Sequence, residues 1–360
     1  MNIFDRIEVG DYEQVVFCHD RPTGLRAVIA IHSTVLGPAL GGTRFRPYPS
    51  EDEAVEDVLR LAEGMTYKAA AAGLDQGGGK AVIIGDPAQI RTDELIRTYA
   101  RFVNSLSGRY ITAEDVGTTQ ADMDLIREET KYVTGTSEAR GGSGDPSAAT
   151  AYGVHRAMRA LMFVSSGAAS LAGQHVVVAG VGKVGTHLVV RLVDEGAQVT
   201  IADVNAAAVE RIRSRYGAAV SVVPPEEAHR TPCDIYSPCA LGGVLNSSTI
   251  PELRCWGIAG AANNQLADAS CASRLRDAGV LYVPDFIANA GGIINIAEER
   301  APGGYTRQRA YARVTRVHDT ALSVFDLAKE DDVTTADAAV RLARRRLDAA
   351  AGVHQIRTFP

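Results

Sequence analysis

A glycine-rich turn between a strand and a helix is the feature that most constrains this chain. The run His175-Val-Val-Val-Ala-Gly180-Val-Gly182-Lys-Val-Gly185 places the pattern G-x-G-x-x-G after an apolar strand and at the start of a helical segment. Gly180 permits a tight turn, Gly182 lets a pyrophosphate approach the helix N-terminus, and Gly185 lets helix and strand pack closely. The combination predicts a dinucleotide-binding unit.

An acidic residue follows at the position where such a unit contacts the adenosine ribose. Asp203 ends the next apolar strand, 18 residues after Gly185. Its carboxylate can accept hydrogen bonds from ribose hydroxyls and would repel a 2′-phosphate, while Val204 and Asn205 supply no cation. We therefore expect the cofactor to be NAD rather than NADP. The alternative is that Asp203 only caps the following helix.

The second part of the chain alternates apolar strands with helical segments. Near-continuous apolar strands separated by helices are typical of a parallel sheet that is covered on both faces. The predicted strands are 175–180, 198–203, 220–223, 233–237, 256–260 and 280–284. This pattern predicts a Rossmann-type, doubly wound domain. It begins at Asp145-Pro146, where Asp145 can cap a helix that has Pro146 in its first turn.

The first part of the chain has a different pattern. Residues 12–19 and 25–32 are predicted strands of a hairpin with a Pro-Thr-Gly turn, and 109–115 is a strand that runs into a loop. Helices are predicted at 51–64, 92–106 and 119–130, and two more after Tyr305. The fold class is therefore α/β with two domains and a cleft between them. We expect residues 1–145, with a C-terminal helix 331–360 packing back, to form one domain with a mixed sheet, and residues 146–330 to form the NAD-binding domain.

Composition excludes several classes of protein. The chain has 360 residues, of which 46% are hydrophobic and 22% charged, as expected of a globular enzyme. A net charge of −6 argues against nucleic acid as a partner, and the apolar runs are too short to cross a membrane. The N-terminus has no signal-peptide pattern. Five cysteines without C-x-x-C spacing predict reduced thiols, no metal site and a cytoplasmic location.

Two lysines flank a second glycine run. Lys68 and Lys80 are twelve residues apart, with Gly77-Gly78-Gly79 directly before the second. Burying a lysine is costly unless it is paired, so two lysines beside a glycine-walled surface indicate a bound anion. The plainer interpretation is that the glycines form a turn and Lys80 is a solvated residue.

Several motifs together resemble one enzyme family. These are Gly37-Pro-Ala-Leu-Gly-Gly42-Thr-Arg44, Met65-Thr-Tyr-Lys68, Gly77-Gly-Gly-Lys80, Thr112-Ala-Glu-Asp115-Val-Gly, Ser237-Pro-Cys-Ala240, Gly260-Ala-Ala-Asn263-Asn264 and Asn289-Ala-Gly-Gly292. In this order they resemble the glutamate/leucine/phenylalanine/valine dehydrogenases, and most closely the branched-chain members. The resemblance implies NAD-dependent, reversible oxidative deamination of an L-amino acid to a 2-oxo acid and ammonia by a homo-oligomer.

The resemblance also implies roles for individual residues. Lys68 would bind the substrate α-carboxylate, Lys80 would activate water for attack on the iminium carbon, and Asp115 would exchange protons with the amino group. A lysine acts as a base only when neutral, a form that burial favours. The further substrate-binding residues implied are Gly41, Gly42, Met65 and Asn264. Those implied for the cofactor, beside the glycine motif and Asp203, are Thr150, Lys183, Val184, Cys239, Ala240, Ala261, Asn263 and Asn289.

The side-chain pocket implied by the resemblance is aliphatic. Glutamate-specific members carry a lysine at the position of Leu40, and Ala113, Ile293 and Ile296 match the other pocket positions of leucine enzymes. Valine, leucine and isoleucine are therefore the expected substrates. Two alternatives remain open, a phenylalanine dehydrogenase of the same family and a noncatalytic NAD-binding sensor. Both isoleucines could also be ordinary core residues.

Overall fold

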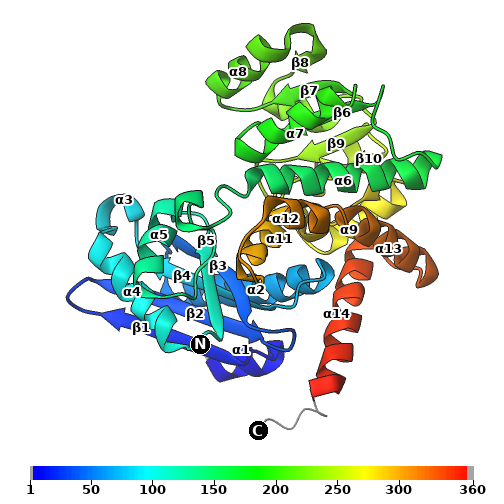
Figure 1. Cartoon of the computed structure of the whole chain (residues 1–360). Coiled ribbons are helices and arrows are strands. Elements are labelled where there is room, and N and C mark those ends of the chain that lie inside the picture. The colour runs from blue at the N-terminus through cyan, green and yellow to red at the C-terminus, as the bar shows by residue number, and fades with distance from the viewer. Residues whose placement is uncertain (1–2, 355–360) are drawn as a thin grey trace. The chain divides into compact units, whose positions relative to one another are not determined.

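The chain is organised around two sheets, one in each of two units of the computed structural model, which describes residues 3–354 (Figure 1). Of the described residues, the first unit comprises 3–145, 296–309 and 343–354. The second comprises residues 146–295 and 310–342. The sequence predicts that the chain rejoins the first domain at residue 331. In the structure, residues 296–309 already belong to the first unit, and residues 331–342 belong to the second.

The sheet of the first unit has five strands and is mixed, as predicted. Its spatial order is β1 (Gln14–Asp20), β2 (Leu25–Ser33), β4 (Gly77–Ile84), β3 (Ala39–Arg46) and β5 (Tyr110–Glu114). The hairpin of β1 and β2 and the β2–β4 pair are antiparallel, while β3 runs parallel to both β4 and β5. The helices are α1 (Ile3–Gly10), α2 (Glu51–Ala71), α3 (Pro87–Ile90), α4 (Asp93–Ser105), α5 (Gln120–Glu129) and the short η1 (Glu138–Arg140).

The two faces of this sheet carry different residues. Ala39, Phe45 and Tyr110 pack with buried side chains of α4 and α5. Val28, Ala30 and Val82 on the other face pack against α2. Because side chains alternate along a strand, residues that are paired in register share a face. The pairs Leu40–Gly78, Gly42–Ala113, Arg44–Val82 and Ala30–Lys80 therefore lie on the α2 face.

The glycine run before Lys80 belongs to a strand. β4 begins at Gly77, so the turn interpretation is wrong, and so is a solvated Lys80, because that residue is 6% exposed. A Cβ at Gly78 would lie 2.1 Å from the Thr66 nitrogen of α2, and one at Gly41 would lie 1.7 Å from the Gly79 oxygen of β4. The glycines are needed because α2, β3 and β4 approach too closely for a side chain.

The second unit contains a six-stranded parallel sheet in the order β11-β10-β9-β6-β7-β8. Read from β8, this is the 3-2-1-4-5-6 order of a doubly wound dinucleotide-binding fold, which confirms the predicted class. The strands are β6 (His175–Ala179), β7 (Gln198–Ala202), β8 (Val220–Val222), β9 (Ile235–Pro238), β10 (Gly257–Ile258) and β11 (Leu281–Tyr282). Their centres are buried, as in Val176, Val177 and Val178.

Helices connect these strands. They are α6 (Ser147–Ser166), α7 (Lys183–Asp194), α8 (Ala206–Tyr216), α9 (Ser270–Asp277), α10 (Asp285–Ala288) and α11 (Gly291–Ala297), with the short η2 (Gly217–Ala219), η3 (Pro225–Arg230), η4 (Ile250–Glu252) and η5 (Glu298–Arg300). Pro146, and not Asp145, occupies the N-cap position of α6. The sequence therefore placed this helix start one residue too early.

Three helices follow Tyr305 in the described chain, whereas the sequence predicts two. They are α12 (Arg307–Val314), α13 (Val317–Glu330) and α14 (Thr335–His354). The break between α12 and α13 consists of Thr315 and Arg316, which include neither Gly nor Pro to mark it. The predicted C-terminal helix 331–360 begins four residues later than expected, at Thr335 of α14, and is described as far as His354; residues 355–360 lie outside the described chain. No helix among the described residues is both long and apolar enough to cross a membrane.

Arg346 of the last helix, like its neighbour Arg344, contacts the end of α2. Arg346 Nη1 donates to the carbonyl oxygens of Ala70 at 3.1 Å and Leu74 at 2.7 Å, and its Nη2 lies 2.8 Å from Asp75 Oδ1. The last carbonyl groups of a helix lack partners within the helix, so an arginine side chain is a suitable donor to them. The turn that leads from α2 into β4 is therefore fixed by a residue that lies far along the chain.

Substitution of Gly78 tests the close approach of α2 and β4. We expect Gly78→Ala to lower the free energy of unfolding by about 1–3 kcal/mol, because the new methyl group overlaps the Thr66 backbone. Gly64→Ala is the matched control, since a Cβ there meets no atom within 4 Å. It should stabilise α2 by about 0.5–1 kcal/mol. Denaturant titration measures both, and a Gly78 variant as stable as wild type would contradict the packing argument.

Candidate functional site

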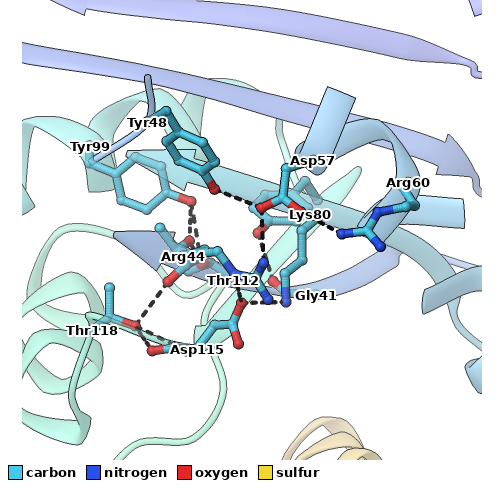
Figure 2. A network of polar contacts seen from close by, with 12 residues as sticks. Gly41, Arg44, Tyr48, Asp57, Arg60, Lys80, Tyr99, Thr112, Asp115 and Thr118 are labelled. Atoms are coloured by element: carbon cyan, nitrogen blue, oxygen red, sulfur yellow. Dashed lines mark hydrogen bonds and ion pairs between the residues drawn. The ribbon is translucent and has the colours of Figure 1, made fainter. Parts of the chain in front are cut away.

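A buried ion pair lies on the α2 face of the first sheet. Lys80 Nζ is 2.7 Å from Asp115 Oδ2, and the two side chains are 8% and 19% exposed (Figure 2). Lys80 lies on β4, and Asp115 directly follows β5. A buried ammonium is stable only beside a compensating charge, which the carboxylate provides. The structure thus brings the two predicted catalytic residues into contact.

Glycines and a threonine hold Asp115 in this position. A Cβ at Gly42 would lie 2.9 Å from the Asp115 Cβ and 2.5 Å from the Glu114 oxygen, so only glycine lets β3 pass this close to the end of β5. The Thr118 hydroxyl donates to the Thr43 carbonyl at 2.9 Å and accepts from the Asp115 N–H at 3.0 Å. The loop that carries Asp115 is therefore tied to β3 on both sides of the carboxylate.

A second cation shares the Asp115 carboxylate. Arg44 Nε lies 3.3 Å from the same Oδ2 atom, and Arg44 Nη1 lies 2.9 Å from Asp57 Oδ2 (Figure 2). Burial opposes ionisation of Asp115, but Lys80 and Arg44 together lower the pKa of its carboxyl below the usual value. Burial likewise opposes the charge on Arg44, yet Asp115 and Asp57 raise the pKa of its guanidinium.

Asp57 anchors the far side of this arginine. Its Oδ2 atom accepts from the Tyr48 hydroxyl at 2.8 Å, and its Oδ1 lies 3.1 Å from Arg60 Nη2. Burial works against the Asp57 carboxylate, but the hydrogen bond from Tyr48 and the charge of Arg44 lower the pKa of its carboxyl. Burial and Asp57 in turn raise the pKa of Tyr48, so its hydroxyl remains a donor.

Sequence reasoning gave no role to Arg44, Asp57 or Tyr48. Arg44 was visible only as the last residue of a glycine motif. Asp57 lies among the buried positions Val55, Val58 and Leu59 of α2, although it is charged and only 12% exposed. A charged residue on the apolar side of an amphipathic helix is the signal that could have indicated a buried partner.

The other predicted substrate-binding residues of the first unit lie on the same elements. Met65 and Lys68 are on the last turns of α2, next to Thr66, where the helix meets Gly78. Lys68 is partly exposed. Leu40 and Ala113 are buried on the α2 face of β3 and β5. Gly41 faces the opposite side, where the Tyr110 hydroxyl donates to its carbonyl at 2.6 Å.

The glycine motif of the second unit has the geometry of a dinucleotide loop. Gly180 has a φ of +107°, and a Cβ there would lie 2.7 Å from the Ala240 Cβ and 2.9 Å from the Cys239 carbonyl carbon. A Cβ at Gly185 would lie 2.0 Å from the Gly180 oxygen, whereas one at Gly182 meets nothing within 4 Å. The loop therefore packs against the end of β9 and leaves open space at Gly182, which is the N-cap of α7.

Asp203 stands beside this loop. Its Oδ2 accepts from the Val181 N–H and its Oδ1 from the Asn205 N–H, both at 2.7 Å. The helix α8 is capped by Asn205 and not by Asp203, so the capping alternative is wrong. Lys183 and Val184 form the first turn of α7, where the exposed N–H groups of a helix can bind a phosphate.

A second group of predicted cofactor residues gathers at the loops after β10 and β11. Asn289 Nδ2 donates to Asn263 Oδ1 at 2.8 Å and to the Ala261 carbonyl at 3.1 Å. Asn264 adopts a left-handed φ of +52° in the same loop. A Cβ at Gly292 would lie 2.6 Å from Thr150 Oγ1, so Thr150 contacts the Asn289–Gly292 segment.

The two isoleucines of the predicted pocket fall in different units. Ile293 is buried in the second unit, and Ile296 is partly buried in the first. Their grouping with Leu40 and Ala113 in one pocket stays a prediction. Across residues 3–354, no three His, Cys, Asp or Glu side chains are grouped so that they could hold a metal ion.

Two protein-family models match the sequence of this chain. Residues 12–132 match the dimerisation domain of the Glu/Leu/Phe/Val dehydrogenases, and residues 204–354 match the glutamate/leucine/phenylalanine/valine dehydrogenase model. The chain belongs to this family. This membership confirms the resemblance drawn from the motifs.

Among these family members, leucine dehydrogenase of Geobacillus stearothermophilus is 50% identical over 97% of this chain and 94% of its own. Valine dehydrogenase of Streptomyces coelicolor is 52% identical over 94% and 93%. The crystal structure of L-tryptophan dehydrogenase from Nostoc punctiforme superposes with a TM-score of 0.84, at 43% identity over 97% of this chain and 99% of that one.

The residues of the second unit fit the nicotinamide dinucleotide that a family dehydrogenase uses. The open space at Gly182 admits a phosphate, and the Asp203 carboxylate provides an acceptor for sugar hydroxyls. In addition, Asn289 Oδ1 is buried and accepts no hydrogen bond within the protein. A buried acceptor without a partner is costly, so a donor on a bound ligand would satisfy it.

Two glycine substitutions separate binding from folding in the second unit. We expect Gly182→Ala to fold normally but to bind the dinucleotide at least about tenfold more weakly, because its methyl group occupies the phosphate position. Gly185→Ala should instead lower the melting temperature, since its methyl group overlaps the Gly180 carbonyl. Calorimetric binding and thermal unfolding distinguish the two. Unchanged affinity in Gly182→Ala would show that the phosphate lies elsewhere.

Proposed function

We propose that this protein is an NAD-dependent dehydrogenase that converts branched-chain L-amino acids, in a reversible reaction, to 2-oxo acids and ammonia. The contact between Lys80 and Asp115 carries the proposal. It places an amine and a carboxylate together on a face that also bears the apolar Leu40 and Ala113. Relatives about 50% identical over nearly the whole chain are leucine and valine dehydrogenases.

Each charged residue has a distinct part in this reaction. Lys68 binds the substrate α-carboxylate as a point charge. Asp115 accepts a proton from the substrate ammonium group. A bound NAD would supply the acceptor for the Cα hydride. Lys80 in its neutral form then takes a proton from the water that attacks the iminium carbon. Because Asp115 lies 2.7 Å from Lys80, the two groups are placed to share that proton before ammonia leaves.

The substrate side chain is selected by a pocket that carries no charged residue at the position of Leu40. Leu40 has no exposed surface and offers no partner to a second carboxylate, so a glutamate side chain would be desolvated without compensation. Ala113, Ile293 and Ile296 complete an aliphatic wall in this proposal. Because one methylene is worth only about 1–3 kcal/mol, the enzyme should accept valine, leucine and isoleucine with related efficiencies.

NAD is the proposed cofactor because of the charge at the ribose position. The Asp203 carboxylate would repel a 2′-phosphate, and the next residues, Val204 and Asn205, provide no cation to neutralise one. We also propose that the chain assembles into a homo-oligomer through its first unit, since the model that matches residues 12–132 describes a dimerisation domain. Sedimentation equilibrium measures the assembled mass directly.

An aromatic substrate is the second candidate. The 43% identity to an L-tryptophan dehydrogenase favours it, because such likeness extends over nearly all of both chains. The two candidates differ in the volume that the pocket must admit. Ile293 and Ile296 are branched and narrow the pocket in our proposal, which favours the aliphatic substrates.

A substrate panel decides between them. We expect reduction of NAD with L-leucine, L-valine and L-isoleucine at higher kcat/KM than with L-phenylalanine, L-tryptophan or L-glutamate, followed by near-ultraviolet absorbance. With NADP, kcat/KM should fall at least about tenfold, equivalent to about 1.4 kcal/mol of repulsion. Preference for an aromatic amino acid would favour the second candidate. Reduction with none of them would indicate a noncatalytic NAD-binding protein.

Removal of the proposed base tests the mechanism. We expect Lys80→Ala to lower kcat by about 100-fold or more, because general-base catalysis typically contributes about 10²–10⁴-fold. Dinucleotide affinity should stay near that of wild type, since Lys80 belongs to the first unit. Steady-state kinetics and calorimetry measure the two quantities, and turnover retained in the variant would remove the assignment of Lys80.

A further inference from the structure

Arg44 lies between two carboxylates that come from different elements. On β3, it contacts Asp115 after β5 through Nε and Asp57 on α2 through Nη1. Its side chain is 18% exposed. Because the guanidinium is planar and its donors diverge at fixed angles, contacts at two of its nitrogens fix its orientation.

The four least exposed charges of this group balance, with Lys80 and Arg44 opposing Asp115 and Asp57. Lys80 and Arg44 face Asp115, while Arg44 and Arg60 face Asp57, and the Tyr48 hydroxyl donates to the same Asp57 oxygen that Arg44 contacts. Arg60 is 63% exposed, so water screens its contribution. Without Arg44, the buried Asp115 would therefore depend on Lys80 as its one nearby cation among the pairs described here.

We propose that Arg44, held by Asp57 and Tyr48, is a positioning residue that fixes the Asp115 carboxylate against Lys80 and keeps it ionised to receive the substrate proton. This inference rests on the proposed function. Arg44 would act through Asp115, with no contact of its own to the reacting atoms. Its role differs from that of Lys80, which must exchange a proton, because a guanidinium stays charged throughout.

The direction of the pH effect follows from the groups that face Asp115. These are Lys80 on β4 and Arg44 on β3, while Asp57 on α2 faces Arg44 and Tyr110 on β5 packs on the opposite face of the sheet. Burial disfavours the Asp115 carboxylate, and the two cations favour it. Loss of Arg44 should therefore raise the pKa of Asp115 and move the acidic limb of the kcat/KM profile to higher pH.

The experiment compares four variants of the full enzyme with NAD and L-leucine over a range of pH. We expect Arg44→Gln to shift the acidic limb upward by about one pH unit and to lower kcat more than it changes KM. Arg44→Lys restores the positive charge but not the planar guanidinium that contacts both carboxylates. The acidic limb of its kcat/KM profile should therefore return toward that of wild type while kcat stays reduced. Asp57→Asn should lower kcat without moving the acidic limb to higher pH, because it removes the carboxylate that holds Arg44 and leaves the Arg44 charge in place.

Arg60→Gln is the matched control, since it removes an exposed contact of Asp57 and leaves Asp115 untouched. Its profile should match wild type, and circular dichroism with thermal unfolding shows whether each variant is folded. If Arg44→Gln does not fold, the opposite expectations for Arg44→Lys and Asp57→Asn keep the test decisive. An unshifted limb in a folded Arg44→Gln variant, with only a lower melting temperature, would mean that Arg44 merely ties β3 to α2.

The two levels of the inference fail differently. A wild-type protein that oxidises no amino acid would remove the proposed function and the role of Arg44 with it. An active wild type whose acidic limb does not move in Arg44→Gln would overturn the role of Arg44 alone and leave the proposed function standing.

Discussion

The contact between Lys80 and Asp115 is the constraint on which the first unit depends. An ammonium and a carboxylate that are withdrawn from water must lie close together, and the strands and helix that carry them must approach accordingly. Glycines at positions 41, 42 and 78 permit this approach, since a Cβ at any of them would overlap a neighbouring element. The glycine motifs of this unit are thus needed so that the backbone segments carrying the ion pair can approach one another.

The class of the fold could be predicted from the sequence because strands buried on both faces of a sheet have nearly continuous apolar sequences. Strands such as His175–Ala179 are apolar throughout, and helices separate them at regular intervals. β3 was missed for the opposite reason, since Gly41 and Gly42 have low strand propensity and interrupt any apolar pattern. The run Gly77–Gly79 was similarly ambiguous, because local sequence cannot tell a turn from a strand that another backbone approaches.

The candidate site could be predicted only where its residues lie within motifs. Lys80 and Asp115 were found because each is embedded in a recognisable run of sequence. Arg44 and Asp115 are 71 residues apart, and Arg44 and Asp57 are 13 apart, so no local pattern relates them. Their association depends on strand order and on the placement of α2 over the sheet, and these are tertiary properties.

The discontinuity of both units bears on how the protein is made. Sheet strands β1–β5 leave the ribosome early, but the first unit also needs residues 296–309 and the chain from 343 onward. Arg346, which donates to the end of α2 before the turn into β4, is 276 residues from Ala70 along the chain. The connection from α2 to β4 therefore gains its last contacts only after a much longer stretch of chain has been synthesised, and until then the nascent chain must keep a partly stabilised sheet from aggregating.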